Sequence, residues 1–129
     1  MNIIDHSGLS VSDFERLLAF YEKALKPLGI SVIMRVGKEQ TGDFEAVGLG
    51  RDGKPSFWLS GQGQTTPHIH IAFVADSRAD VDAFYQAALA AGGSDNGPPG
   101  LRPMYHPNYY GAFVLDPDGH NIEAVCHKP

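Results

Sequence analysis

The stretch HSGLSVSDFERLLAFYEKALKPLG, residues 6–29, is followed later in the chain by a related stretch, HIAFVADSRADVDAFYQAALAAGG, residues 70–93. A shift of 64 residues without a gap aligns the two, and seven of the 24 positions are then identical. The identities include the first histidine of each stretch and an Ala-Phe-Tyr triplet, at residues 19–21 and 83–85. Because the shift is half the chain length, the repeat predicts two similar modules related by a pseudo-twofold axis, with a functional site between them.

The first copy has the pattern of one strand, one helix and three more strands. Residues 3–11 are expected to form a strand, and Ser12 with Glu15 forms a capping box that begins a helix. Apolar residues at three- and four-residue spacing then give this helix one buried face, until Pro27 and Gly29 end it. The strands expected next are residues 30–36, 44–49 and 56–60, with a hairpin turn at residues 51–54.

The second copy repeats this order. A strand at residues 68–75 leads to a helix that Ser77 and Asp80 begin with a weaker capping box and that Gly92-Gly93 ends. Residues 95–107 hold four of the nine prolines and are expected to be a loop, although the repeat would place a strand there. The remaining expectations are strands at 110–115 and 121–127 joined by a turn at 116–119 that leaves His120 in solvent.

Several strands with one helix per half indicate an α+β fold, in which two pseudo-symmetric βαβββ modules form a curved sheet around a central cleft. At 129 residues the chain is expected to be a single domain, residues 1–129. Module one spans about residues 1–60, a linker 61–66, and module two about 67–129.

Composition limits the function. A formal net charge of −5 argues against nucleic acid or an anionic membrane as a partner, because both need a basic surface. The sequence has no stretch typical of a membrane span or a signal peptide. A single cysteine, Cys126, excludes an internal disulfide, and we expect a cytoplasmic protein that acts on a small molecule.

Three residues suggest metal chemistry. His6 and His70 are equivalent in the repeat, and Glu123 lies among apolar neighbours on the last expected strand, where a carboxylate is costly to bury unless a cation neutralises it. Two histidines and one carboxylate form a common three-ligand metal site. Each residue taken alone is more often structural. His68 competes with His70, because residues two apart on a strand share a face.

These residues lead to a family resemblance. His6 with Leu9 and Val11, the segment 70–73, and above all FVLDPDGHNIE at residues 113–123 resemble the vicinal oxygen chelate superfamily. That superfamily includes glyoxalase I, fosfomycin-resistance enzymes, extradiol dioxygenases and bleomycin-resistance proteins. The resemblance implies one divalent ion per chain (Zn, Fe, Mn, Ni or Co) held by His6, His70 and Glu123, and frequently a homodimer.

One metal ligand of glyoxalase I has no counterpart in this sequence. Where glyoxalase I has a further glutamate ligand, this chain has Phe57 or Trp58, and residues 55–60 offer no carboxylate or imidazole. In glyoxalase I that glutamate takes part in the proton transfer, so we expect Phe57 and Trp58 to form an apolar pocket wall and the glyoxalase I reaction to be absent.

The remaining candidates for the substrate pocket are polar aromatic residues and an arginine, namely Arg102, Tyr105, His106, Tyr109 and Tyr110. Arg102, like Arg35, could pair with an anionic group of a substrate. Two functions remain open: a metal-dependent enzyme of lyase, isomerase or dioxygenase type acting on a small oxygen-chelating substrate, or a metal-free protein that sequesters a small molecule, as bleomycin-resistance proteins do. A third alternative is a degenerate paralogue in which the two histidines are only structural. The sequence assigns no catalytic residue.

Overall fold

The computed structural model describes residues 3–129 and contains two four-stranded sheets. The first sheet consists of β1 (Ser7–Ser10), β2 (Ser31–Val36), β3 (Ala46–Arg51) and β4 (Lys54–Ser60) in the order β1-β4-β3-β2. The second consists of β5 (His70–Val74), β6 (Ser94–Leu101), β7 (Tyr110–Leu115) and β8 (Asn121–Cys126) in the equivalent order β5-β8-β7-β6. In both sheets the first strand pairs parallel with the last, and the other pairs are antiparallel. The predicted α+β fold of two βαβββ modules is confirmed.

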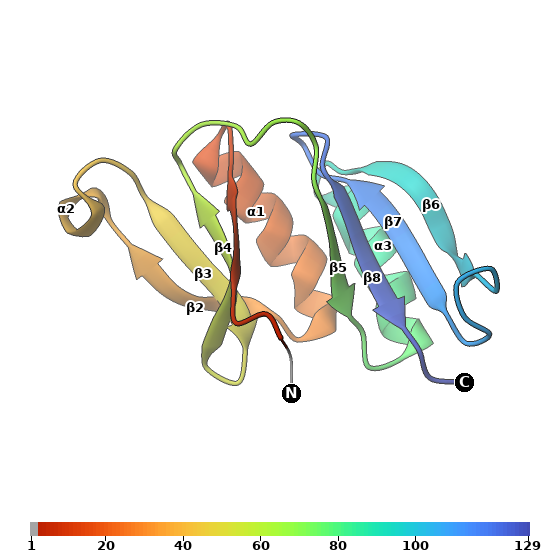
Figure 1. Ribbon diagram of the computed structural model, residues 1–129. Helices are drawn as coiled ribbons and strands as arrows, with labels where there is room; N and C mark the ends of the chain where they lie inside the picture. The colour runs from red at the N-terminus through yellow and green to blue at the C-terminus, as the bar shows by residue number, and fades with distance from the viewer. Residues whose placement is uncertain (1–2) are drawn as a thin grey trace.

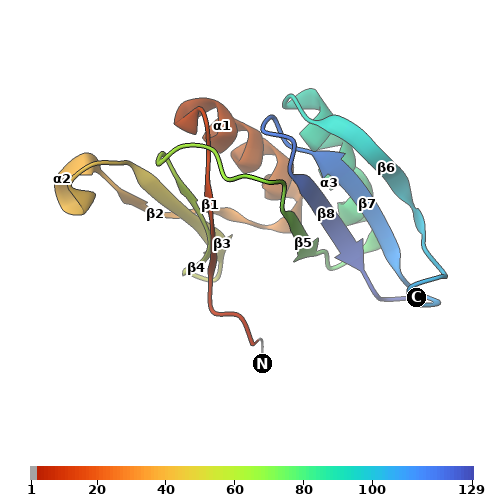
Figure 2. The same ribbon diagram turned by 45° about the horizontal axis from the view of Figure 1, so that its top comes forward.

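The two long helices lie on the same side of the sheets and contact each other (Figure 1). They are α1 (Phe14–Leu25), extended by the 3₁₀ turn η1 (Lys26–Leu28), and α3 (Arg78–Ala90). A third, short helix, α2 (Lys38–Thr41), follows β2 and was not expected from the sequence. In both views β1 and β5 are the edge strands on the sides where the two sheets face each other (Figure 2), and Arg51 at the end of β3 donates a hydrogen bond to the Val74 carbonyl of β5 at 2.6 Å.

The two helix starts differ. Ser77 caps α3 as predicted, because its hydroxyl accepts a hydrogen bond from the Asp80 N–H at 3.1 Å. The predicted Ser12 cap of α1 is wrong by one residue: Asp13 is the cap, and its carboxylate accepts from the Arg16 N–H at 3.2 Å. Ser12 instead donates its N–H and its hydroxyl to Asp118, in the turn of module two.

A buried tyrosine also joins the modules. The Tyr21 hydroxyl of α1 donates to the Asp116 carboxylate at 2.5 Å, and burial, with Asp116 beside it, raises the pKa of Tyr21 well above its usual value. Tyr85, its repeat equivalent on α3, is half-exposed and donates to Asp95 at 2.9 Å. The two Ala-Phe-Tyr triplets therefore occupy equivalent helices, but only the first reaches across to the other module.

Two local predictions were wrong for identifiable reasons. The expected loop at residues 95–107 begins as strand β6, an edge strand that pairs only with β7. Pro98 and Pro99 are tolerated there because they fall in the irregular stretch between the paired residues Gly97 and Gly100, where the register with β7 shifts. His120 was expected in solvent but is fully buried, and its Nδ1 accepts a hydrogen bond from the Ile69 N–H at 3.1 Å.

A groove separates the two sheets between β1 and β5. Its volume is about 670 Å³, and its lining is contributed by both modules, including Ser7, Phe57, His70, Ile71 and Phe73. Within residues 3–129, β1 pairs only with β4 and β5 only with β8, so each sheet presents one unpaired edge to the groove. In that same part of the chain, no helix has the length and apolar character needed to cross a membrane.

Candidate functional site

Strand alternation places the candidate ligands of module two on the sheet face opposite the helices. On β5, Ile71 and Phe73 pack against the core, so His70 and Ala72 point the other way. On β8, Glu123 is the register partner of Ala72 in a parallel pair, so its side chain lies on the same face as His70. The two residues are therefore neighbours across adjacent strands.

His70 and Glu123 are in direct contact. His70 Nε2 lies 3.0 Å from Glu123 Oε1, and the carboxylate is almost completely buried, with 1% of Glu123 exposed. The other ring nitrogen, Nδ1, lies 3.1 Å from the backbone oxygen of Asn121. A carbonyl oxygen only accepts hydrogen bonds, so Nδ1 carries a proton, and in a neutral ring Nε2 then turns its lone pair toward the carboxylate. A lone pair and a carboxylate oxygen repel each other, so this contact is favourable only when a proton or a metal cation lies between Nε2 and Oε1.

Tyr109 contacts the second oxygen of the same carboxylate. Its hydroxyl donates a hydrogen bond to Glu123 Oε2, and burial, followed by the contact with Glu123, raises the pKa of Tyr109 above that of an ordinary tyrosine. The phenol therefore stays protonated at neutral pH and acts as a donor.

Two further side chains extend the site along the same face. The Phe113 ring stacks against His70 with ring centroids 6.2 Å apart, and Phe113 is the register partner of Glu123 on β7. The guanidinium of Arg102 lies over the Phe113 ring, 5.5 Å from its centroid. This face thus offers a carboxylate and an imidazole next to an aromatic surface that ends in a positive charge.

The first-module histidine lies apart from this pair. His6 directly precedes β1, is exposed, and places Nδ1 2.8 Å from Asp5 Oδ2, while Asp5 Oδ1 accepts from Lys54 Nζ at 2.6 Å. Hydrogen bonds from Lys54 and His6 lower the pKa of Asp5. In residues 3–129, no group of three His, Cys, Asp or Glu side chains converges as metal ligands, so a single chain does not bring His6 to His70 and Glu123.

The hydrogen bonds of the candidate histidine in each module nonetheless suit a metal-binding role. A histidine that binds metal through Nε2 usually donates its Nδ1 proton to a carboxylate or a backbone carbonyl, which fixes the tautomer. His70 has this arrangement with the Asn121 carbonyl, and His6 has it with the Asp5 carboxylate. His70 and Glu123 would hold a divalent ion as two of three protein ligands. The ring of His6 is oriented as a third ligand would be, but within one chain it does not reach the other two.

The strand register identifies the first-module counterpart of Glu123. Gly8 pairs with Trp58, whereas its repeat equivalent, Ala72, pairs with Glu123. Trp58 therefore occupies the counterpart position, half-exposed on the open face. Phe57 points to the helices, where its ring centroid lies 5.1 Å from that of Tyr21. Of the two residues considered from the sequence, only Trp58 can line the open face, while Phe57 lies at the base of the groove.

The other pocket candidates lie in different places. Tyr105 is exposed and its ring lies 5.1 Å from that of Tyr109, and the His106 ring lies 5.6 Å from the His127 ring, at the same end of the sheet. Tyr110 faces the helices instead, because its hydroxyl donates to Asp82 of α3 at 2.6 Å. The structure brings Tyr105, Tyr109 and Arg102 near Glu123 and His70, and it places Tyr110 outside this group.

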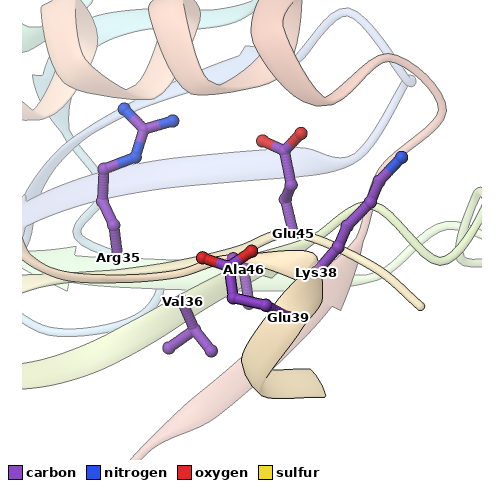
Figure 3. Close-up of a pocket in the computed structure, with 7 residues that line it drawn as sticks. Arg35, Val36, Lys38, Glu39, Glu45 and Ala46 are labelled. Carbon is purple, nitrogen blue, oxygen red and sulfur yellow. The ribbon is translucent and has the colours of Figure 1, made fainter. Parts of the chain in front are cut away.

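A second cavity, of about 340 Å³, lies near α2 and holds Arg35 together with Lys38, Glu39 and Glu45 (Figure 3). Arg35 points toward α1, where Glu15 Oε1 lies 3.8 Å from its guanidinium. Positive and negative side chains alternate around this cavity, and it contains none of the candidate metal ligands.

Sequence reasoning missed two side chains of the site, Phe113 and Asp5, and one contact between residues that it had named. Phe113 stands in the C-terminal motif and shares the strand parity of Tyr109, which was a usable signal. Asp5 adjoins His6 directly, and a carboxylate next to a candidate histidine ligand was a second signal in the sequence. The Tyr109–Glu123 contact carries no sequence signal, because it depends on how the loop before β7 folds.

Comparisons with known proteins agree with this architecture. The sequence model of the Glyoxalase/Bleomycin resistance protein/Dioxygenase superfamily matches residues 3–124. The solved structure of a glyoxalase/bleomycin resistance protein from Albidiferax ferrireducens T118 has 27% identity and a TM-score of 0.74, covering 99% of this chain and 100% of that one. A search of curated proteins gave no match.

More distant structures share the fold. A glyoxylase/bleomycin resistance protein/dioxygenase domain from Frankia sp. EAN1pec has 20% identity and a TM-score of 0.73, covering 99% of this chain and 93% of that one. Glyoxalase I from Zea mays has 22% identity and a TM-score of 0.71, covering 95% of this chain and 45% of that longer protein.

Proposed function

The chain belongs to the glyoxalase/bleomycin resistance protein/dioxygenase superfamily, and from this premise we propose that it is a divalent-metal-dependent enzyme acting on a small, oxygen-chelating substrate. The observation that carries the proposal is the contact between His70 Nε2 and the buried Glu123 carboxylate, with the Nδ1 side of the ring engaged by a backbone carbonyl. When bound, the ion supplies Lewis-acid polarisation of the substrate oxygens, in a reaction of lyase, isomerase or dioxygenase type.

The proposal includes a homodimer in which His6 of a second copy completes the ligand set. His6 is oriented by Asp5 and exposed, yet within one chain it directly precedes the first sheet, whereas His70 belongs to the second. The unpaired edges of β1 and β5 and the partly apolar groove between them offer a surface that a second copy can cover. A two-fold dimer that sets the first sheet of one copy against the second sheet of the other would create two equal sites.

Phe113 and Arg102 suggest the shape of the substrate. The aromatic face of Phe113 next to His70 suits a flat or apolar part, and the Arg102 guanidinium beyond it suits a carboxylate or another anionic group. A substrate of this kind would reach the metal with its oxygen atoms while its far end pairs with Arg102.

The alternative function is metal-free sequestration of a small molecule. One observation favours it: within a single chain, both oxygens of Glu123 already have partners, His70 and Tyr109. A protonated His70 would then neutralise the carboxylate without a metal, and the open face would bind its ligand directly.

Metal analysis separates the two functions. The protein, purified without chelator and then titrated with Zn²⁺ or Co²⁺, is expected to bind one ion per chain, because each chain contributes one His70–Glu123 pair. An absence of binding at micromolar metal, with the dimer intact, would overturn the enzyme proposal and leave the sequestration function.

Glyoxalase I activity should be negligible. Isomerisation of the methylglyoxal–glutathione hemithioacetal requires a base beside the metal-bound substrate, and the position equivalent to Glu123 in module one holds Trp58. We expect no turnover above background with the protein loaded with nickel, zinc, cobalt or manganese. Robust isomerisation that is lost in Glu123→Gln would contradict this expectation.

A further inference from the structure

We propose that Tyr109 is a positioning residue that restricts Glu123 to binding the metal through one oxygen, Oε1. The inference rests on the proposed metal function and adds a role for a side chain outside the ligand set. Its basis is that the Tyr109 hydroxyl donates to Oε2, while Oε1 lies 3.0 Å from His70 Nε2. One carboxylate oxygen, Oε2, therefore accepts the hydrogen bond from Tyr109, and the other, Oε1, is left for the metal.

A glycine makes room for this contact. Gly111 lies on β7, two residues after Tyr109, and a Cβ atom built there would lie 3.1 Å from Tyr109 Cε1 and 3.2 Å from Glu123 Oε2. Both distances are shorter than ordinary carbon contacts, so a larger residue would push the phenol and the carboxylate apart. The local sequence therefore provides the space in which the hydrogen bond forms.

The Tyr109 ring is also held from several sides. The Tyr105 ring packs against it in an edge-on arrangement at 5.1 Å, and the His127 ring does so at 5.2 Å. The backbone oxygen of Tyr109 accepts a hydrogen bond from the Arg102 N–H at 2.7 Å, and this bond closes the loop between β6 and β7. A phenol fixed in this way keeps its hydroxyl on Oε2 at little entropic cost when the carboxylate binds a cation.

The chemical consequence concerns coordination. A carboxylate can bind a metal through one or both oxygens, and binding through both occupies two positions around the ion. With Oε2 engaged by Tyr109, Glu123 occupies one position only. Three protein ligands then leave room for two oxygen atoms of a chelating substrate.

The test compares Tyr109→Phe with the matched control Tyr105→Phe. Tyr105 is exposed and contacts Tyr109 through its ring rather than contacting Glu123. Phenylalanine keeps this ring, so Tyr105→Phe removes a hydroxyl without removing the packing on Tyr109. We expect Tyr109→Phe to weaken Co²⁺ affinity about 10- to 100-fold, the usual effect of losing a hydrogen bond to a metal ligand, and Tyr105→Phe to leave the affinity near that of the parent. The visible spectrum of bound Co²⁺ should change in Tyr109→Phe only, because the freed carboxylate alters the coordination geometry.

Gly111→Ala gives a second, independent variant that keeps the Tyr109 hydroxyl but crowds it, and it should change the spectrum in the same direction. Circular dichroism and thermal melting verify that each variant is folded. If Tyr109→Phe and Gly111→Ala both keep the parent's affinity and spectrum, the inference is overturned while the metal function stands. If the parent itself binds no Co²⁺, the proposed function fails, and the inference that rests on it is overturned with it.

Discussion

Replacing Glu123 with glutamine should lower the affinity for Zn²⁺ or Co²⁺ by at least about 100-fold, the upper end of what loss of a supporting group alone causes. The substitution keeps the shape of the side chain but removes the negative charge and one metal-binding oxygen. Glu123 is the one carboxylate on β8, it is 1% exposed and it contacts His70 directly, so no other side chain of this strand can replace it. Isothermal titration calorimetry of the parent and the variant measures the change.

His68→Ala is the matched control for Glu123→Gln. His68 is a histidine two residues before His70, but it is exposed, and its ring lies 6.4 Å from that of His120 rather than at the carboxylate. The His68→Ala variant should therefore bind metal like the parent. Equal losses in Glu123→Gln and His68→Ala would show that the ion binds elsewhere and would refute the ligand assignment.

Mixing two variants that each lack one metal ligand should restore part of the metal binding. His6→Ala removes a ligand supplied by module one, and Glu123→Gln removes a ligand supplied by module two. If each site uses His6 of one copy and the His70–Glu123 pair of the other, a mixed dimer contains one intact site. Random reassociation of equal amounts makes half of the dimers mixed, so about one quarter of the parent's sites should return.

The recovery is measured as tightly bound Co²⁺ after co-expression or joint refolding of the two variants. A mixture of His70→Ala and Glu123→Gln is the matched control, since both changes fall in module two and no combination of chains restores a site. If His6 served the same chain as Glu123, the first mixture would also recover nothing. That result would exclude the shared site.

Much of the fold could be predicted because the repeat and the helix pattern are local signals. The shift of 64 residues aligns the first strand and the helix of the two copies, so in these segments each copy supports the prediction made for the other. The edge strand β6 escaped prediction because Pro98 and Pro99 normally argue against a strand, and only its position beside β7 makes them acceptable. The burial of His120 depends on the Ile69 N–H needing an acceptor, which a turn motif does not reveal.

The site was predictable in part for a similar reason. His70 could be selected from the repeat and Glu123 from its apolar neighbours and the C-terminal motif, and the structure places the two in contact. The position of His6 could not be predicted, because it depends on how the two modules pack rather than on how each one folds. The links that fix this packing, Tyr21 to Asp116 and Ser12 to Asp118, connect residues about 100 positions apart and leave no periodic trace in the sequence.

Trp58, which occupies in module one the position of Glu123 in module two, provides a fluorescence signal at the proposed site. It is the chain's one tryptophan, and it lies half-exposed on the open face of the first sheet, packed over Gly48. In the proposed dimer this indole would face the second sheet of the other copy, close to the bound ion and substrate. Its emission would then report occupancy in unlabelled protein, with quenching by a paramagnetic ion such as Co²⁺ distinguishing a filled site from an empty one.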